Sequence, residues 1–487
     1  MKKTVHLVLP EKIGVIAPEI YGHFSEHIGG VFYDGLWVGK ESKIPNVNGF
    51  RKDIIEKMKK IKAPVLRWPG GCFAEIYDWK DGIGENRPIR TSWWTKYDKR
   101  YESNEVGTHE FVGLCELIGA KPYFAVNVTS ITPLDARNWM DYCLSPRGST
   151  TLAKLREANG HPDPFYIPYW GIGNENWGGG GHMTPDYYAL EFRKFATVLD
   201  NVPCTTERSL IAGGANAGSY DWTRKLAAGC VDVKRIVDGM SFHYYCGQAG
   251  EAVNFSENQW YELLQKAELM DELIRRHYAI VEGYKMEEKM KLVIDEWGCW
   301  HPDGSGPSKG YNLFEQQSTM RDALISALTL NIFNNHCEKI KMANVAQLCN
   351  NLHALFLAGG ENCITTPTYH VFDMFKGHQG GEAIRTVVED NAEIESRVSA
   401  SASVKDGVLT VTLANYSCKD SAEIDLNLLG GKYCGKAEVT VLSGEKINSC
   451  NTFEHPNNVT PKYLTLDSAN TVIVPAAGVV SIETKIN

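Results

Sequence analysis

Two glutamates in this sequence follow short apolar stretches, and tryptophan stands close behind each. Glu175 lies in YWGIGNENW (residues 169–177), between two asparagines, and a glycine run ends the segment. Glu296 lies in LVIDEWGCW (residues 292–300). A pair of carboxyl groups can cleave a glycosidic bond, because one protonates the leaving oxygen while the other attacks the anomeric carbon or guides water to it. Either glutamate alone could belong to a polar loop after a core strand, but together they predict such a pair.

The elements that would position these glutamates follow one repeated pattern of apolar strand, polar tip, loop and amphipathic helix. The eight expected strands end within residues 21–27, 65–71, 123–127, 169–175, 209–216, 240–245, 292–297 and 343–348. Helical periodicity lies between them, for example at residues 50–61 and 260–277. Eight such units predict a (β/α)8 barrel, in which the carboxyl ends of the strands gather their side chains at one mouth.

The texture of the sequence changes after about residue 380. Segments such as 408–413 and 437–442 alternate with a period of two, and Gly, Asn, Asp and Ser separate them. This pattern is typical of an antiparallel β-sandwich, here expected to be jelly-roll-like. We therefore predict three parts. They are an N-terminal strand region (residues 1–17) that joins the sandwich, a catalytic barrel (residues 18–380) and the β-sandwich (residues 381–487).

Charge and composition exclude several classes of partner. The net charge is −9 and no basic run occurs, which argues against nucleic acid and anionic membranes. No apolar stretch is long enough to span a bilayer, and the N-terminus lacks the features of a secretory signal. The 13 cysteines form no CxxC motif and resemble reduced core thiols. These features predict a cytoplasmic protein.

Several longer motifs give the sequence a family resemblance. They are GNENWG (173–178), DEWG (295–298), YGHFSEH (21–27), RWPGGCF (67–73), GTHEF (107–111) and MANVAQL (342–348). In this order they resemble the α-L-arabinofuranosidases of glycoside hydrolase family 51, which are retaining glycosidases of clan A. The resemblance covers the barrel and, more loosely, the sandwich.

The resemblance implies a retaining, exo-acting enzyme that removes terminal α-L-arabinofuranosyl residues from arabinoxylan or arabinan oligosaccharides. In it, Glu175 would be the general acid/base and Glu296 the nucleophile, while Asn174 would bind the sugar 2-OH. It implies no cofactor and no metal, because the two carboxyls do the chemistry. It also implies a homo-oligomer, expected to be a hexamer.

The same resemblance assigns further substrate-binding residues. Glu26 would bind sugar hydroxyls, and Cys72 would line the sugar pocket. Apart from the resemblance, Trp300 is expected to contact the substrate, because it is an aromatic residue close to Glu296 in the sequence. Tyr245 would hydrogen-bond the nucleophile, although its neighbour Tyr244 is the alternative by one residue. Many members have Asn where this chain has Cys72, and Glu85 stands where Pro is common, so the preference for the leaving group is left open.

Other interpretations of single residues remain. Glu26 could be a salt-bridge partner of Arg67, and Cys72 could pack in the core. The pair Trp93–Trp94 fits a cleft wall or a subunit contact equally. His182 and His301, in Gly- and Pro-rich loops, are expected at the surface.

Other classes of function remain as well. The pattern H-x-x-E-H at His23 and His27 matches a class of zinc hydrolases, but that class requires it on a helix. A silent sugar-binding protein is a second rival. Within the enzymes, a β-xylosidase or an endoglucanase is the alternative specificity.

Overall fold

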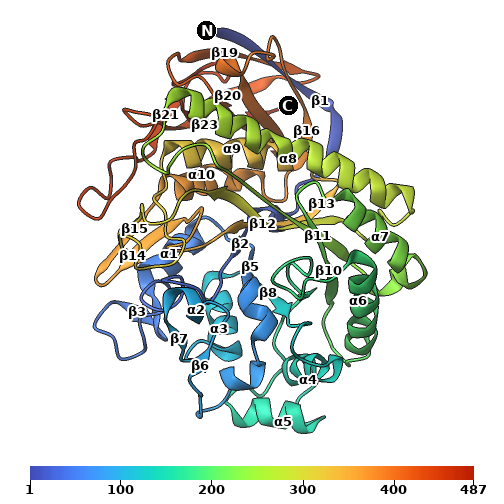
Figure 1. The fold of residues 1–487 in the computed structure, drawn as a ribbon. Helices are drawn as coiled ribbons and strands as arrows, with labels where there is room; N and C mark the ends of the chain where they lie inside the picture. The colour runs from blue at the N-terminus through green and yellow to red at the C-terminus, as the bar shows by residue number, and fades with distance from the viewer. The chain divides into compact units, whose positions relative to one another are not determined.

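Eight strands of the computed structural model, which describes residues 1–487, close into a barrel (Figure 1). They are β2 (Gly22–Phe24), β5 (Val65–Trp68), β8 (Lys121–Val126), β9 (Tyr169–Ile172), β10 (Ser209–Asn216), β11 (Gly239–Gly247), β12 (Leu292–Trp300) and β13 (Ile340–Ala346). Their order around the barrel is β10-β11-β12-β13-β2-β5-β8-β9. Neighbours from β2 through β5, β8, β9 and β10 to β11 pair in parallel. The predicted (β/α)8 barrel is confirmed.

The barrel strands are short and buried on both faces, as parallel strands covered by helices must be. In β8, every residue after Lys121 is buried, and β5 is buried throughout. The helices between β2 and β12 are α1 (Lys52–Lys60), α2 (Thr95–Asp98), α3 (Thr108–Ile118), α4 (Pro133–Leu144), α5 (Thr151–Ala158), α6 (Pro185–Asp200), α7 (Tyr220–Cys230) and α8 (Glu257–Gly283).

Local sequence explains where these helices begin and which face they bury. Helix α1 buries Ile54, Ile55 and Met58, which share one face at helical spacing. Helix α4 begins at Pro133, directly after a capping box. The Thr132 hydroxyl accepts from the Asp135 backbone amide, and the Asp135 carboxylate accepts from the Thr132 backbone amide.

Nine strands form a second, mostly antiparallel sheet that the alternating segments of the sequence predict. They are β1 (Lys2–Val15), β16 (Glu382–Val388), β17 (Val398–Lys405), β18 (Val408–Asn415), β19 (Ala422–Leu429), β20 (Tyr433–Leu442), β21 (Lys462–Leu466), β22 (Thr471–Val474) and β23 (Val479–Ile486). Their order is β21-β20-β23-β18-β17-β16-β1-β19-β22. The sequence predicts a (β/α)8 barrel with a C-terminal antiparallel β-sandwich, and the closed barrel with its separate curled C-terminal sheet confirms this fold class.

The N-terminal strand β1 runs beside strands from the far end of the chain (Figure 1). It pairs antiparallel with β16, Val5 opposite Val388, and parallel with β19, Val5 opposite Leu426. Val5 and Leu7 are fully buried in the apolar core of this sheet. The strand continues past a bulge to Val15.

Helix α9 (Met320–Asn335) packs on this sheet through polar contacts as well as apolar ones. Asn331 accepts from the Ser401 and Thr412 hydroxyls at 2.7 Å each, and the Asn334 amide donates to Ser401 at 3.0 Å. These bonds satisfy polar groups that are otherwise buried. Helix α10 (Pro367–Phe375) and the hairpin of β14 (Phe356–Gly359) and β15 (Asn362–Thr365) complete this part of the chain.

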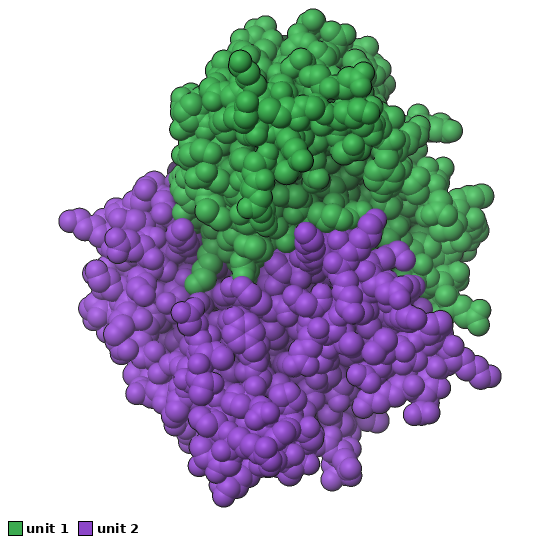
Figure 2. Space-filling view, turned by 180° about the vertical axis from the view of Figure 1, so that it is seen from behind, with its two compact units in different colours: residues 1–21, 245–272, 298–487 green, residues 22–244, 273–297 purple.

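The chain folds as two compact units, coloured green and purple in Figure 2. Unit 1 comprises residues 1–21, 245–272 and 298–487, and unit 2 comprises residues 22–244 and 273–297. Both candidate catalytic glutamates therefore belong to unit 2. The division at residues 17 and 380 stays a prediction. No helix in the structure combines the length and apolar composition needed to cross a membrane.

Candidate active site

Glu175 lies on a tight turn directly after β9, and the turn has an unusual backbone. Gly173 has φ 86° and Glu175 has φ 43°, so both are in the left-handed region. A side chain on Gly173 would meet Asn176 Oδ1 at 2.4 Å, which leaves room only for glycine. The Glu175 carbonyl accepts from the amides of Gly178 and Gly180 at 2.7 and 3.1 Å. This turn directs Glu175 away from the buried strand, and its side chain is 21% exposed.

Glu296 lies within β12, and its side chain is only 8% exposed. The guanidinium of Arg67, from β5, holds it in place. Nη1 of Arg67 donates to Glu296 Oε1 at 2.8 Å, and Nη2 donates to Asn174 Oδ1 at 2.7 Å. Burial lowers the pKa of Arg67, but the charges of Asp295 and Glu296 outweigh it and raise the pKa above its usual range. A fixed buried cation of this kind favours an ionised carboxylate beside it.

His243, from β11, lies between the two candidate glutamates. Its Nδ1 is 3.1 Å from Glu175 Oε1 and 3.5 Å from Glu296 Oε2. Burial lowers the pKa of His243, but Glu296 and Glu175 outweigh it, so that the pKa is raised. A carboxylate oxygen of Glu175 and one of Glu296 lie within 4.8 Å of each other. The two carboxyls are thus close enough to act on the two sides of one scissile bond.

Glu26 is buried beside this pair, after β2. Its Oε1 accepts from the Phe73 amide at 2.9 Å and from the Trp94 indole at 3.1 Å. Burial and the charge of Glu296 raise the pKa of Glu26 to about 7, although these donors and Arg67 oppose the rise. The indole bond places Trp94 beside Glu26, which is consistent with the cleft-wall interpretation of Trp94.

The glycines of RWPGGCF allow the backbone to approach the acidic groups. A Cβ on Gly70 would lie 2.6 Å from Glu26 Cγ, and one on Gly71 would lie 2.9 Å from Glu296 Oε1. Cys72 follows them and is partly exposed, and its Sγ lies 2.7 Å from the position of a Cβ on Gly179. Burial and the charge of Glu26 raise the pKa of the Cys72 thiol well above its usual range.

The structure therefore brings five of the seven sequence-predicted residues into one site of unit 2, namely Glu26, Cys72, Asn174, Glu175 and Glu296. The other two, Tyr245 on β11 and Trp300 at the end of β12, lie in unit 1. Their rings pack edge to face with centroids 5.3 Å apart. Their contact with substrate stays a prediction.

Sequence reasoning missed three groups of this site. Local sequence does not identify His243 as a site residue, because its place between the glutamates depends on strands that are distant in sequence. Asp295 is buried and accepts from the Tyr123 hydroxyl at 3.2 Å, and burial raises its pKa. Glu75, in the short 3-10 helix η2 (Cys72–Ile76), accepts from the Asn174 amide at 2.6 Å. Nothing in the local sequence distinguishes Glu75 from a surface glutamate.

The H-x-x-E-H segment does not have the arrangement of a zinc site, and His27 bonds to neighbouring side chains instead. It lies on β2 and the following loop, not on the helix that the zinc pattern requires. Trp68 Nε1 donates to His27 Nε2 at 2.9 Å, and His27 Nδ1 lies 3.1 Å from Glu102 Oε2. Burial lowers the pKa of His23 to about 3, which keeps it neutral.

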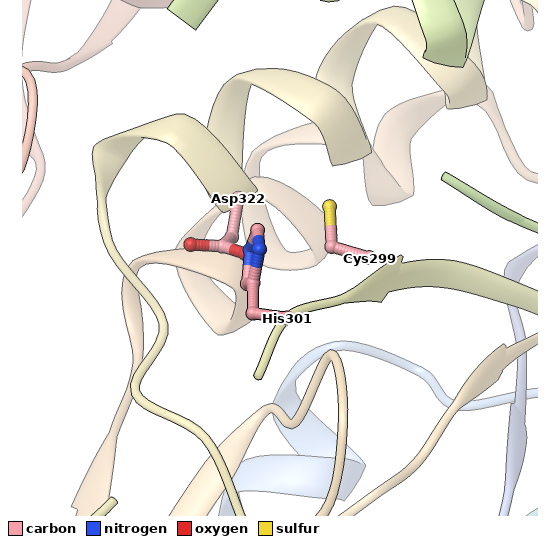
Figure 3. A group of neighbouring side chains, drawn as sticks. All are labelled: Cys299, His301 and Asp322. Carbon is pink, nitrogen blue, oxygen red and sulfur yellow. The ribbon is translucent and has the colours of Figure 1, made fainter. Parts of the chain in front are cut away.

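A second cluster of possible ligands consists of Cys299, His301 and Asp322, all buried in unit 1 (Figure 3). His301 Nε2 lies 2.9 Å from Asp322 Oδ1, and the amide of Thr319 donates to Oδ2 at 2.7 Å. Arg321 Nη2 lies 3.4 Å from the other ring nitrogen of His301. These bonds join the end of β12 to the first turn of α9, so we assign the cluster a structural role. The expected surface position is wrong for His301, which this partnership buries, and correct for His182, which is exposed.

Comparison with known proteins decides the family. The model of the α-L-arabinofuranosidase 1 domain matches residues 57–259, and that of the α-L-arabinofuranosidase C-terminal domain matches residues 295–477. The crystal structure of the family 51 arabinofuranosidase from Xanthomonas axonopodis pv. citri is 34% identical, with a TM-score of 0.92 over 99% of this chain and all of that one. The chain belongs to the α-L-arabinofuranosidases of glycoside hydrolase family 51.

Other relatives align with nearly the whole chain. An intracellular exo-α-L-arabinofuranosidase of Bacteroides ovatus is 38% identical over 99% of this chain and 95% of its own length. An intracellular exo-α-(1→5)-L-arabinofuranosidase of Bacillus subtilis is 29% identical over 94% of each. The α-L-arabinofuranosidase of Thermotoga maritima, solved as an arabinose complex, is 28% identical with a TM-score of 0.84. The family that the sequence motifs predict is confirmed.

Proposed function

We propose that this family 51 arabinofuranosidase is a retaining, exo-acting enzyme in which Glu296 is the nucleophile and Glu175 the general acid/base. The observation that carries the proposal is the approach of their carboxylate oxygens to within 4.8 Å. Retaining glycosidases place the two carboxyls roughly 5–5.5 Å apart, whereas inverting enzymes need about 6.5–9.5 Å to admit a water molecule. The short separation supports double displacement.

In the first step, a Glu296 carboxylate oxygen attacks the anomeric carbon of the arabinofuranosyl residue. The bond from that carbon to the leaving oxygen breaks, and Glu175 gives its proton to that oxygen. The product is a β-linked glycosyl ester on Glu296. In the second step, the Glu175 carboxylate takes a proton from water as the water oxygen attacks the same carbon. The ester bond breaks, Glu296 is released as carboxylate, and the product keeps the α configuration.

The environments of the two glutamates suit these roles. Glu296 is 8% exposed and bonded to Arg67, so it is held as a fixed, ionised nucleophile. Glu175 is 21% exposed, which leaves it access to a leaving group and to water. Asn174, held by Arg67, is suited to bind the sugar 2-OH, while Glu26 and Cys72 line the sugar pocket.

The substrate proposal rests on the names of relatives and on family resemblance. The relatives from Bacteroides ovatus and Bacillus subtilis are both named intracellular exo-acting arabinofuranosidases. We propose that this enzyme likewise acts inside the cell, where it removes terminal arabinofuranose from arabinoxylan or arabinan oligosaccharides. Substrate contacts from Tyr245 and Trp300 and a hexameric assembly belong to the same proposal.

A panel of three aryl glycosides tests the substrate. The α-L-arabinofuranoside should give a kcat/KM far above those of the β-D-xyloside and the β-D-glucoside. A higher kcat/KM on the xyloside would overturn the proposed specificity in favour of a β-xylosidase. Proton NMR of the first-formed sugar should show the α anomer, since inversion would produce the β anomer first.

A further inference from the structure

Glu75 is a buried carboxylate that the proposed chemistry does not use. It lies in η2, three residues after Cys72, and its side chain is inaccessible to solvent. Its two oxygens meet amide N–H groups. Oε1 accepts from the Asn174 backbone at 2.6 Å and from the Asn176 side-chain amide at 3.3 Å. Oε2 accepts from the backbones of Val128 and Thr129 at 2.9 and 3.0 Å.

These four donors belong to the segments that directly follow two neighbouring barrel strands. Val128 and Thr129 follow β8, and Asn174 and Asn176 follow β9. One carboxylate therefore ties the ends of both strands to the helix η2, which carries Cys72. A charged acceptor strengthens each of these bonds, and four N–H groups match the acceptor sites of an ionised carboxylate.

The two donors that follow β9, Asn174 and Asn176, stand directly before and after Glu175 in the chain. The backbone of Glu175 is left-handed, with φ 43°, a conformation that is unfavourable for a residue with a side chain. Such a conformation persists only where its surroundings fix it. Asn174 is fixed through its backbone amide and Asn176 through its side chain, which also donates to the Gly180 carbonyl at 2.8 Å.

We propose that Glu75 is a positioning residue for the acid/base: its carboxylate fixes the turn at residues 173–176 so that Glu175 reaches the leaving oxygen. This rests on the proposed role of Glu175. Glu75 touches neither substrate nor reacting atoms, and it acts through the backbone of the residue before Glu175 and the side chain of the residue after it. Burial raises the pKa of Glu75 to about 7, and the amides of Val128 and Asn174 oppose that rise.

The test uses the dependence of rate on the leaving group. A general acid contributes about 10²–10⁴-fold when the leaving group is poor, and little when an acidic phenol departs unprotonated. Glu75→Gln keeps the size of the side chain but turns one acceptor into a donor that faces N–H groups. It should lower kcat/KM on an arabino-oligosaccharide by on the order of 10-fold or more. It should leave kcat/KM on the dinitrophenyl α-L-arabinofuranoside nearly unchanged.

Two further variants complete the design. Glu110→Gln is the matched control, because Glu110 also accepts from a backbone amide, that of Gly107, and from Arg87, but lies outside the turn that carries Glu175. It should leave the ratio of the two kcat/KM values unchanged. Asn176→Ala removes one donor to Glu75 and should shift the ratio in the same direction as Glu75→Gln, which keeps the test available if Glu75→Gln does not fold.

Glu175→Ala, measured in parallel, separates the two proposals. Suppose that Glu175→Ala shows the leaving-group dependence, while Glu75→Gln lowers kcat/KM equally on both substrates. Glu75 is then only structural, so the positioning role is overturned and the role of Glu175 stands. If neither variant shows the dependence, the role of Glu175 falls and the positioning role falls with it. A selective loss in Glu75→Gln, beside the same loss in Glu175→Ala, supports both.

Discussion

Arg67 and Glu296 form a buried ion pair, with Arg67 Nη1 2.8 Å from Glu296 Oε1. Both side chains are almost inaccessible to solvent, so removing one partner leaves an uncompensated charge. Arg67→Met should lower the free energy of unfolding by about 3–5 kcal/mol and abolish most activity. Thermal unfolding of the variant beside the wild-type protein measures this, and an unchanged Tm would contradict the pairing.

Arg67→Lys separates charge from geometry at the same position. Lysine keeps the positive charge but lacks the planar fork with which Arg67 reaches Glu296 and Asn174 together. We expect a smaller loss of stability than in Arg67→Met, together with a large fall in kcat/KM. Equal stability losses in the two variants would show that charge does not stabilise this site.

A methyl group on Gly71 tests the close approach of backbone to nucleophile. In Gly71→Ala the new Cβ would lie 2.9 Å from Glu296 Oε1, so the carboxylate must move. We expect kcat/KM to fall by on the order of 10²-fold, as for other displacements of about 1 Å near reacting groups, with the fold retained. Gly113→Ala, in α3, meets no atom within 4 Å and should leave activity unchanged. Comparable losses in both variants would argue against a specific contact.

The sequence predicts the barrel and the acidic pair because both produce recognisable patterns within short stretches of sequence. Apolar strands with polar tips identify Glu175 and Glu296, and alternating segments identify the second sheet. The roles of Glu75 and His243 cannot be predicted in this way, because they depend on which strands become neighbours in space. The bond from Trp94 to Glu26 is of the same kind, because it joins two loops that the sequence separates.

The raised pKa of Glu26 makes stability depend on pH. Its value is about 7 in the folded protein, against a usual value of 4.5. The protonated form is thus favoured by folding, and this contribution is complete below about pH 4.5 and is lost as the pH rises through about 7. The shift corresponds to about 3 kcal/mol.

Glu26→Gln is neutral at all pH values and removes this dependence. The Tm of the variant minus that of the wild-type protein should therefore rise between pH 4.5 and pH 7.5. Glu85→Gln, the same substitution at an exposed position, serves as the control. If the Tm difference for Glu26→Gln does not change with pH, the proton uptake assigned to Glu26 is contradicted.

Cys72 should be protected from thiol reagents although it is partly exposed. The thiolate is the reactive form, and burial together with the charge of Glu26 raises the pKa of Cys72 far above neutrality. At pH 8, iodoacetamide should modify the exposed Cys434 and leave Cys72 unmodified, as peptide mass spectrometry would report. Rapid modification of Cys72 would mean that the acidic groups around it do not suppress its ionisation.

The division of roles between Glu175 and Glu296 is the central claim, and azide rescue with a dinitrophenyl α-L-arabinofuranoside tests it most directly. Glu175→Ala should still form the β-linked ester on Glu296, because this leaving group needs no proton, and then stall for want of a base. Azide needs no base, so it should accelerate turnover and, by a second inversion, yield the α-arabinofuranosyl azide. Glu296→Ala lacks the first attacking atom, so a good leaving group should not restore the normal path. If Glu296→Ala instead keeps a fast first step while Glu175→Ala does not, the two roles must be exchanged.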